Sequence, residues 1–283
     1  MSFIEELVGP ARALPAYVNT KAERHDGSRT EMCDDLVAAE TAVAVRYNGA
    51  PHAVMMATPA EMEAFAIGFT LTEGVVKKPS EIHAVQVQVL EEGIELDIRI
   101  DATRHRALDR KRRILTGSVG CGLCGAQSIA QAIRRSPAVP LTLQLSDAAI
   151  RRALSELPEM QAINRATGAA HGAAWFNAQG EIELLCEDVG RHNALDKLIG
   201  TMVQSGRAFD RGAVLMTSRA SHEIVQKAAA VGIQALVALS APTSLAITVA
   251  AKSRITLVAF ARANRYTVYT GAERLTESLT PTS

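Results

Sequence analysis

The sequence predicts an α/β protein in which a smaller α+β unit precedes a larger C-terminal α/β unit. In the second half, continuously apolar strands at 213–217, 235–239 and 255–260 alternate with helical segments, which indicates a sheet covered on both faces. In the first half, strands alternate between apolar and polar residues around glycine turns, as half-exposed hairpins do. The chain has 283 residues, 48% of them hydrophobic, so it is long enough for two such units.

The N-terminal part is predicted to contain an arm followed by two hairpins. Residues 1–35 are polar and irregular, so we expect a flexible N-terminal arm. Each hairpin turns at a glycine, and the predicted strands are 41–47 with 52–56 and 83–90 with 94–100.

Two helices are expected in this unit. Thr58 supplies a capping hydroxyl and Pro59 suits a first helical position, so a helix should begin there. It should run to about Glu73 and end at Gly74. A basic segment at about 103–115 is predicted to form the second helix, which leads into a cysteine-containing loop.

A proline-rich stretch at 136–140 indicates a boundary between an N-terminal domain at 36–137 and a C-terminal domain at 138–283. The C-terminal domain should begin with a helix that Ser146 caps and that runs to about Leu157. Strands and helices then alternate along the chain. The further strands are predicted at 170–176, 181–186 and 267–270, and the helices at 191–203, 221–231 and 243–251.

Composition excludes several classes of protein. The chain carries 30 basic and 30 acidic residues, so no overall field would recruit nucleic acid or a membrane surface. No apolar stretch reaches the ~20 residues of a membrane-spanning helix, and the N-terminus lacks the pattern of a secretory signal. With four cysteines, a disulfide framework is not expected and a reducing, cytoplasmic setting fits.

Two cysteines stand in a glycine-rich run, Gly-Cys-Gly-Leu-Cys-Gly, where they occupy positions Cys121 and Cys124. Such a pair can bind zinc, exchange with disulfides or carry sulfur as a persulfide. Structural zinc requires four ligands, yet Cys33 and Cys186 are isolated and the histidines are scattered, so we expect no structural metal. We interpret Cys33 and Cys186 as buried or incidental thiols.

Charge favours sulfur transfer over the other possibilities. Basic residues precede the loop: Arg104, His105, Arg106, Arg110, Lys111, Arg112 and Arg113. Nearby cations lower the pKa of a thiol and so favour the reactive thiolate. The alternatives stay open at this point: a solvated basic helix face, a dithiol redox pair, or two structural thiols.

These motifs resemble those of a known family, the formate dehydrogenase accessory sulfurtransferases (FdhD sulfur carriers). The resemblance covers nearly everything from about 36 to 275. Besides the cysteine loop, it includes YNG at 47–49, FAIGFTLTEG at 65–74, HGAAW at 171–175, EDVGRHNALDK at 187–197 and TSRASHE at 217–223.

The resemblance implies a fold and a function. It implies a C-terminal domain similar to the three-layer fold of cytidine deaminase, without its zinc. It implies that a cysteine desulfurase loads a persulfide onto Cys121, with Cys124 as its catalytic neighbour. The acceptor would be the molybdenum cofactor in its bis(molybdopterin guanine dinucleotide) form, bound as substrate and destined for the catalytic subunit of formate dehydrogenase.

The resemblance also implies a cofactor site. Its residues match the family's cofactor-binding stretch: Phe260, Ala261, Arg262, Ala263, Asn264 and Arg265. This stretch lies just past a predicted strand, where open α/β sheets bind ligands. We expect Phe260 to stack on a ring and the two arginines to hold phosphate. Lysine, proline and glycine are frequent in the family within this stretch and are replaced here by arginine, alanine and asparagine.

A second stretch supplies further candidates for binding the cofactor. Ser218, Arg219 and Ser221 follow another apolar strand and open a helix, whose unpaired N–H groups favour anions. His192 is open to either a ligand contact or packing, and His171 is interpreted as a hydrogen-bonded core residue.

The sequence therefore predicts a two-domain cytoplasmic α/β protein, a homodimer, that acts as a sulfurtransferase and handles the molybdenum cofactor. Two other functions stay open. One is a non-catalytic module that escorts the cofactor and uses the cysteines only for docking. The other is a dithiol oxidoreductase.

Overall fold

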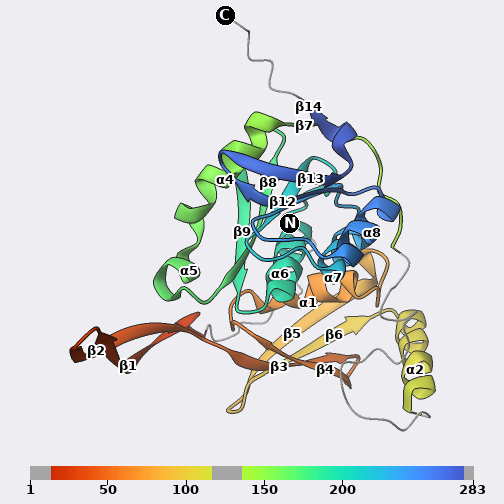
Figure 1. Cartoon of the computed structure of the whole chain (residues 1–283). Coiled ribbons are helices and arrows are strands. Elements are labelled where there is room, and N and C mark those ends of the chain that lie inside the picture. Colours follow the sequence, from red (N-terminus) through yellow and green to blue (C-terminus); the bar gives the residue numbers. More distant parts are fainter. Residues whose placement is uncertain (1–13, 117–135, 277–283) are drawn as a thin grey trace, which may run out of the picture.

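A computed structural model describes residues 14–116 and 136–276 of the chain, without the side chains of 111–116. Within these residues the fold is a mixed α/β arrangement built on two main sheets (Figure 1). No helix in this described part is long and apolar enough to cross a membrane.

The smaller main sheet has four strands in the order β4-β3-β6-β5. Its strands are β3 (Thr41–Tyr47), β4 (Ala50–Ala57), β5 (Ile82–Val89) and β6 (Ile94–Ile100). Both predicted hairpins are confirmed, and β3 and β6 join them by parallel pairing. Alternate residues such as Val43, Val45 and Leu96 are buried on the face that carries helix α1 (Met62–Thr72), because side chains alternate across a strand.

Helix α1 begins later than predicted. Its N-cap is Glu61, in the left-handed region with φ 55°, and Thr58 does not cap it. The Thr58 hydroxyl instead accepts a hydrogen bond from the Val189 N–H, and the Thr58 N–H donates to the Asp188 carboxylate. Thr58, which the local pattern assigned to the helix cap, therefore makes a tertiary contact instead. That contact joins residues 130 positions apart in the sequence.

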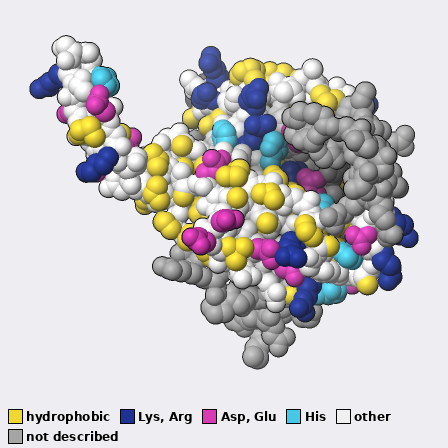
Figure 2. Space-filling model, turned by 90° about the horizontal axis from the view of Figure 1, so that it is seen from below, with side chains coloured by type: hydrophobic (Ala, Val, Ile, Leu, Met, Phe, Trp, Pro, Cys, Tyr) yellow, Lys and Arg dark blue, Asp and Glu magenta, His cyan; other side chains and the backbone are white. Residues whose placement is uncertain are grey.

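The arm expected over residues 1–35 is wrong for residues 17–35, which belong to a strand pair that continues to residue 38. They form an antiparallel ribbon of β1 (Tyr17–Asp26) and β2 (Arg29–Ala38), which projects from the body of the molecule (Figures 1 and 2). Nearly every side chain of the ribbon is exposed, so it lacks the apolar alternation by which strands are recognised in sequence. Main-chain pairing and cross-strand ion pairs such as Lys21–Asp34 hold it instead.

The larger sheet has six strands in the order β13-β12-β11-β10-β8-β9. They are β8 (His171–Asn177), β9 (Ile182–Asp188), β10 (Gly212–Met216), β11 (Ala235–Ala238), β12 (Thr256–Arg262) and β13 (Arg265–Thr270). One face packs on α4 (Asp147–Met160), and the other packs on α6 (Arg191–Gln204), α7 (His222–Ala230) and α8 (Ser244–Ser253). The predicted two-sided covering is confirmed.

Helix α6 joins the two halves of the molecule. It packs against the large sheet on one side and against α1 on the other (Figure 1). A continuous apolar core therefore runs from the small sheet to the large one. The predicted helix cap at Ser146 is confirmed, since its hydroxyl accepts from the Ala149 N–H at 3.1 Å. The division at 136–140 stays a prediction.

Short elements complete the fold. They are the basic helix α2 (Ala102–Thr116), α5 (Ala162–Thr167), the strands β7 (Leu145–Ser146) and β14 (Leu275–Thr276), and the 3₁₀ turns η1 (Pro79–Glu81) and η2 (Ala272–Arg274). The predicted basic helix is thus confirmed.

Candidate functional site

The predicted binding residues gather at one edge of the large sheet. Strands β10, β11 and β12 are parallel, and β9 runs in the same direction because β8 is antiparallel to both β9 and β10. The carboxyl ends of four strands and the start of β8 therefore meet at a common edge. In open α/β sheets this edge is where ligands bind.

The stretch from Phe260 to Arg265 is a tight hairpin rather than the loop expected past a strand. Strand β12 continues to Arg262, Ala263 and Asn264 form the turn, and Arg265 begins β13. The pairing shifts register between Ala259 and Arg262, which marks a bulge. The Phe260 ring and the two arginines therefore lie on strands β12 and β13. They do so because the bulge lets β12 extend beyond its apolar residues.

Phe260 has an unusual backbone at this bulge. Its φ is 50°, in the left-handed region that a bulky residue rarely adopts, and its side chain is 49% exposed. Its N–H donates to the Ser240 carbonyl at 3.1 Å, which holds the bulge against the loop after β11. An exposed ring on strained backbone is the kind of feature that clusters at binding sites.

Two arginines face each other beside this ring. Arg262 and Arg265 are direct cross-strand partners, and both are exposed. The Arg262 guanidinium donates to the carbonyls of Leu239 and Ala261 at 2.6 and 2.7 Å, so its position is fixed. Like charges opposite one another destabilise a hairpin, and an anion between them would remove that cost.

Ser218, Arg219 and Ser221 lie between β10 and α7, with both serines buried and the arginine exposed. Ser221 is the N-cap of α7 but makes no side-chain cap bond, so the first N–H groups of this helix lack a side-chain acceptor. Ala220 hydrogen bonds with Ala241 and Thr243 of the loop after β11. The same loop holds Phe260, so the structure brings the two predicted stretches together.

Cys121 and Cys124 lie outside the described residues. Of the cations predicted to surround them, Arg104 is engaged elsewhere, since it donates to Glu81 at 2.8 Å. This hydrogen bond, with one from the Lys77 N–H, lowers the pKa of Glu81 to about 2. Arg106 and Arg110 lie one helical turn apart and are exposed on α2.

The other two cysteines fit the interpretation as incidental thiols. Cys186 is buried, with its sulfur 3.5 Å from the Thr201 hydroxyl, and burial raises the pKa of its thiol to about 12. Cys33 is half-buried in the exposed ribbon. Among the residues that the structure describes, no three His, Cys, Asp or Glu side chains gather in a way that could hold a metal ion.

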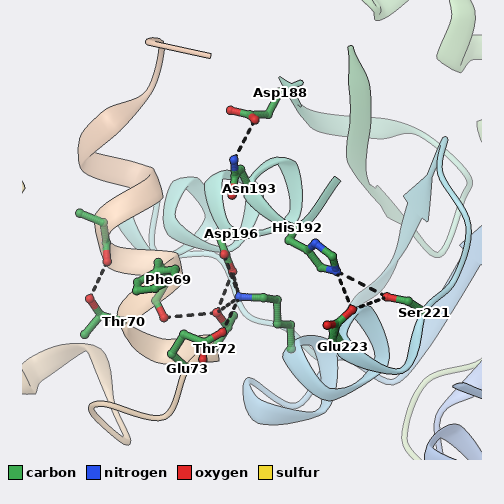
Figure 3. A network of polar contacts seen from close by, with 12 residues as sticks. Phe69, Thr70, Thr72, Glu73, Asp188, His192, Asn193, Asp196, Ser221 and Glu223 are labelled. Carbon is green, nitrogen blue, oxygen red and sulfur yellow. Dashed lines mark hydrogen bonds and ion pairs between the residues drawn. The ribbon is translucent and has the colours of Figure 1, made fainter. Parts of the chain in front are cut away.

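The sequence pointed to His192 and Ser221 separately, but not to their meeting with Glu223 at the same edge. His192 Nε2 lies 3.1 Å from Glu223 Oε2 and 3.5 Å from the Ser221 hydroxyl, and Figure 3 shows the three side chains turned toward one another. The strings EDVGRHNALDK and TSRASHE contain all three residues, but nothing in either string indicates that they meet. Burial, and then the charge of Arg191, lowers the pKa of His192.

Two buried ion pairs lie in the interior next to this edge. Lys197 Nζ lies 2.7 Å from Asp188 Oδ2, and both side chains are fully buried. Lys227 Nζ lies 2.8 Å from Asp196 Oδ2 and 3.0 Å from Glu73, at the end of α1 (Figure 3). The EDVGRHNALDK string therefore ties α6 to β9 through Lys197 and Asp188, and to α1 and α7 through Asp196.

A separate shallow pocket of about 430 Å³ lies on the small sheet and is lined in part by Arg46, His52 and Glu95. It contains none of the predicted site residues. The sheet edge that gathers Phe260 and Ser221 is therefore the stronger candidate site.

Comparison with known proteins agrees with the sequence motifs. The FdhD/NarQ family model matches residues 38–276. A protein of Xanthomonas campestris pv. campestris named sulfur carrier protein FdhD is 46% identical over 261 residues, which are 92% of this chain and 93% of the relative. A protein of the same name from Cupriavidus necator is 45% identical over 261 residues, 92% of this chain and 91% of its own.

A solved structure shares the fold. The crystal structure of a formate dehydrogenase accessory protein from Desulfotalea psychrophila superposes with a TM-score of 0.74 at 26% sequence identity. The match covers 93% of this chain and 100% of that one. On the family match, the curated relatives and this structure together, the chain belongs to the FdhD/NarQ family.

Proposed function

We propose that the protein is a sulfurtransferase that carries sulfur as a persulfide on Cys121 and passes it to the bis(molybdopterin guanine dinucleotide) form of the molybdenum cofactor. The donor would be a cysteine desulfurase, and the recipient of the finished cofactor would be the catalytic subunit of formate dehydrogenase. The names of the relatives support the sulfur-carrier role, and the proposed setting is the cytoplasm, where thiols stay reduced.

The loading step is a thiol exchange. The Cys121 thiolate attacks the outer sulfur of the desulfurase persulfide, forming a new S–S bond as the old one breaks. The electron pair of the broken bond leaves with the desulfurase thiolate, so the step needs no oxidant or reductant. Cys124, three positions away, would attack Cys121 Sγ and release the outer sulfur as hydrosulfide, which leaves a disulfide between the two cysteines.

One observation gives the strongest support for cofactor binding. It is the hairpin on which exposed Phe260, held at φ 50°, lies beside the facing arginines Arg262 and Arg265. A guanine can stack on the ring while phosphate oxygens accept from the guanidinium groups. Arg219 and the N–H groups behind Ser221 would add further donors for phosphate.

The structure also offers a surface for the proposed homodimer. A two-stranded ribbon is only marginally stable alone, yet the β1–β2 ribbon exposes large apolar side chains. They are Tyr17, Val18, Met32, Leu36 and Val37, with exposed fractions between 37% and 66%. Val54 and Met56, 68% and 50% exposed on edge strand β4, extend the exposed apolar surface (Figure 2). We assign this surface to contact with a second copy of the chain.

The sulfur half is tested by intact mass. Wild type incubated with a cysteine desulfurase and cysteine should gain about 32 Da, the mass of one sulfur atom. Cys121→Ala should not gain it, while Cys33→Ala and Cys186→Ala should. An unchanged wild-type mass with an active desulfurase would refute the carrier role and favour the escort module. A loss of about 2 Da in a parallel sample that lacks the desulfurase, where no persulfide can precede the disulfide, would favour the oxidoreductase.

The cofactor half is tested with guanosine diphosphate as the probe. Stacking on an aromatic ring contributes about 1–3 kcal/mol per base, so Phe260→Gly should lower the affinity roughly 5- to 150-fold. Glycine relieves the strain at this φ, so the fold should tolerate the change. Arg211→Gln, an exposed cation before β10, is the matched control. Equal affinity for Phe260→Gly and wild type would exclude Phe260 from the site.

A further inference from the structure

A second group of basic side chains lies at the same sheet edge, away from the β12–β13 hairpin. His171 begins β8 and is paired in register with Asp188 at the end of β9. Arg191 and His192 are the first two residues of α6, which follows β9 after a two-residue connection. The three basic side chains are thus brought together by β8, β9 and the start of α6.

The buried carboxylate of Asp188 makes its hydrogen bonds and its ion pair with other groups. Asp188 Oδ2 contacts Lys197 Nζ at 2.7 Å and accepts from the Thr58 N–H at 3.0 Å. Its Oδ1 accepts from the Gly190 N–H at 2.7 Å and from the Asn193 amide at 3.0 Å. The carboxylate is therefore saturated by groups other than Arg191.

One hydrogen-bond donor of the Arg191 guanidinium is unsatisfied. Arg191 Nε is buried and has no hydrogen-bond partner among the residues that the structure describes. A buried donor without an acceptor costs free energy, so such a group calls for an explanation. An anion supplied from outside would provide the acceptor.

The surroundings favour an anion over a neutral ligand. Arg191 is close enough to both imidazoles to contribute, after burial, to the lowering of their pKa values. Helix α6 has Gly190 as its N-cap, no side-chain cap bond and no acidic residue in its first turn. Glu223 is the acidic group that faces His192, and it also accepts from Ser221. Lys227 adds positive charge from α7.

We infer that Arg191, His171 and His192 form a phosphate subsite at the start of α6, distinct from the Phe260 hairpin. The identity of its natural ligand rests on the proposed function. The bis(molybdopterin guanine dinucleotide) cofactor has two nucleotide arms, each with a pyrophosphate. Strands β12 and β9 are four places apart in the sheet, about 19 Å at the usual strand spacing, so one edge offers two separated phosphate subsites.

The test is calorimetric titration of the full chain with inorganic pyrophosphate. Wild type should bind two equivalents. Arg191→Gln should lose one of them, with an affinity at least tenfold weaker at that subsite. The double variant Arg262→Gln with Arg265→Gln should lose the other and keep the Arg191 subsite. Arg211→Gln should match wild type.

Several outcomes would overturn the subsite. One is that the wild-type protein binds no pyrophosphate. Another is that Arg191→Gln binds pyrophosphate with the same stoichiometry and affinity as wild type. If Arg191→Gln does not fold, His171→Gln with His192→Gln replaces it, and unchanged binding by that variant is equally decisive. Arg191→Lys, which keeps the charge, should retain weakened binding. The sulfur adduct on Cys121 is measured independently of pyrophosphate binding. If the adduct is absent while two equivalents of pyrophosphate bind, the carrier role is refuted and the subsite is retained.

Discussion

Gly68 of α1 and Gly200 of α6 lie where the two helices cross with their backbones in contact. A Cβ on Gly68 would lie 1.8 Å from the Asp196 carbonyl oxygen, and one on Gly200 would lie 1.8 Å from the Ala64 carbonyl oxygen. No side chain fits at either position. This crossing fixes α6, and with it Arg191 and His192 at its start, against the N-terminal half of the molecule.

Gly200→Ala should strongly destabilise the protein. In an unhindered helix this change would stabilise by up to ~1 kcal/mol, but overpacking typically costs about 1–3 kcal/mol. Here the clash is with backbone, so we expect the upper end of that range or more. The measurement is the midpoint of urea unfolding, with Gln204→Ala on the same helix as control. A midpoint equal to that of wild type would show that the helices can separate freely.

Lys197→Met should cost about 3–5 kcal/mol, because it leaves the buried Asp188 carboxylate without its cation. Asp188→Asn should also destabilise, and the double variant should lose less than the sum of the two single losses. Lys21→Met, which breaks the exposed Lys21–Asp34 pair, should cost less than about 1 kcal/mol. Additive losses for Lys197 and Asp188 would contradict direct coupling.

Cys186 should be inert in the folded protein. Its thiol has a pKa of about 12, so almost no thiolate is present near pH 8. Iodoacetamide should leave Cys186 unmodified in the native protein and modify it after denaturation, as read by peptide mass spectrometry. Half-buried Cys33 provides the internal comparison within the same sample. Native alkylation of Cys186 would mean that the core around it opens readily.

Stability should fall as the pH drops below about 6.5. Burial lowers the pKa of His171 and of His192 in the folded state, so the unfolded chain binds protons first on acidification. Above the pKa that these histidines have in the unfolded chain, their neutral forms therefore contribute to stability. That contribution is lost as the pH falls toward their lower pKa values in the folded protein. His192→Gln should flatten the dependence of the unfolding midpoint on pH below about pH 6.5. Gln204→Ala, which removes no titratable group, should leave this dependence unchanged.

Charged residues on the ribbon should separate the proposed dimer. Met32→Glu with Leu36→Lys places charges on two exposed apolar positions of β2 that share one face of the ribbon, where the contact would bury them. Light scattering coupled to size exclusion should give twice the chain mass for wild type and the chain mass for this variant. Thr20→Lys, on the opposite face of the ribbon, is the control. A monomeric wild type would remove the homodimer from the proposal.

Local sequence determined most elements, because their signals act over a few residues. The hairpins around Asn48 and Gly93, the cap at Ser146 and the apolar strands of the large sheet were all predictable from spacing and turn chemistry. The motifs also sufficed to place the chain in its family. The roles of Cys121 and Cys124 stay predictions, since these residues lie outside the described part of the chain.

The tertiary structure decided the rest, because it depends on contacts between distant residues. Thr58 could not be known to serve Val189 instead of its own helix, and the ribbon at 17–38 carries no buried face to mark it. Likewise, Phe260 lies on a bulged strand, and His192 meets Glu223, only once β9, β10 and β12 are aligned in one sheet. Local patterns record propensity, whereas a binding site is made by the packing that joins separate segments.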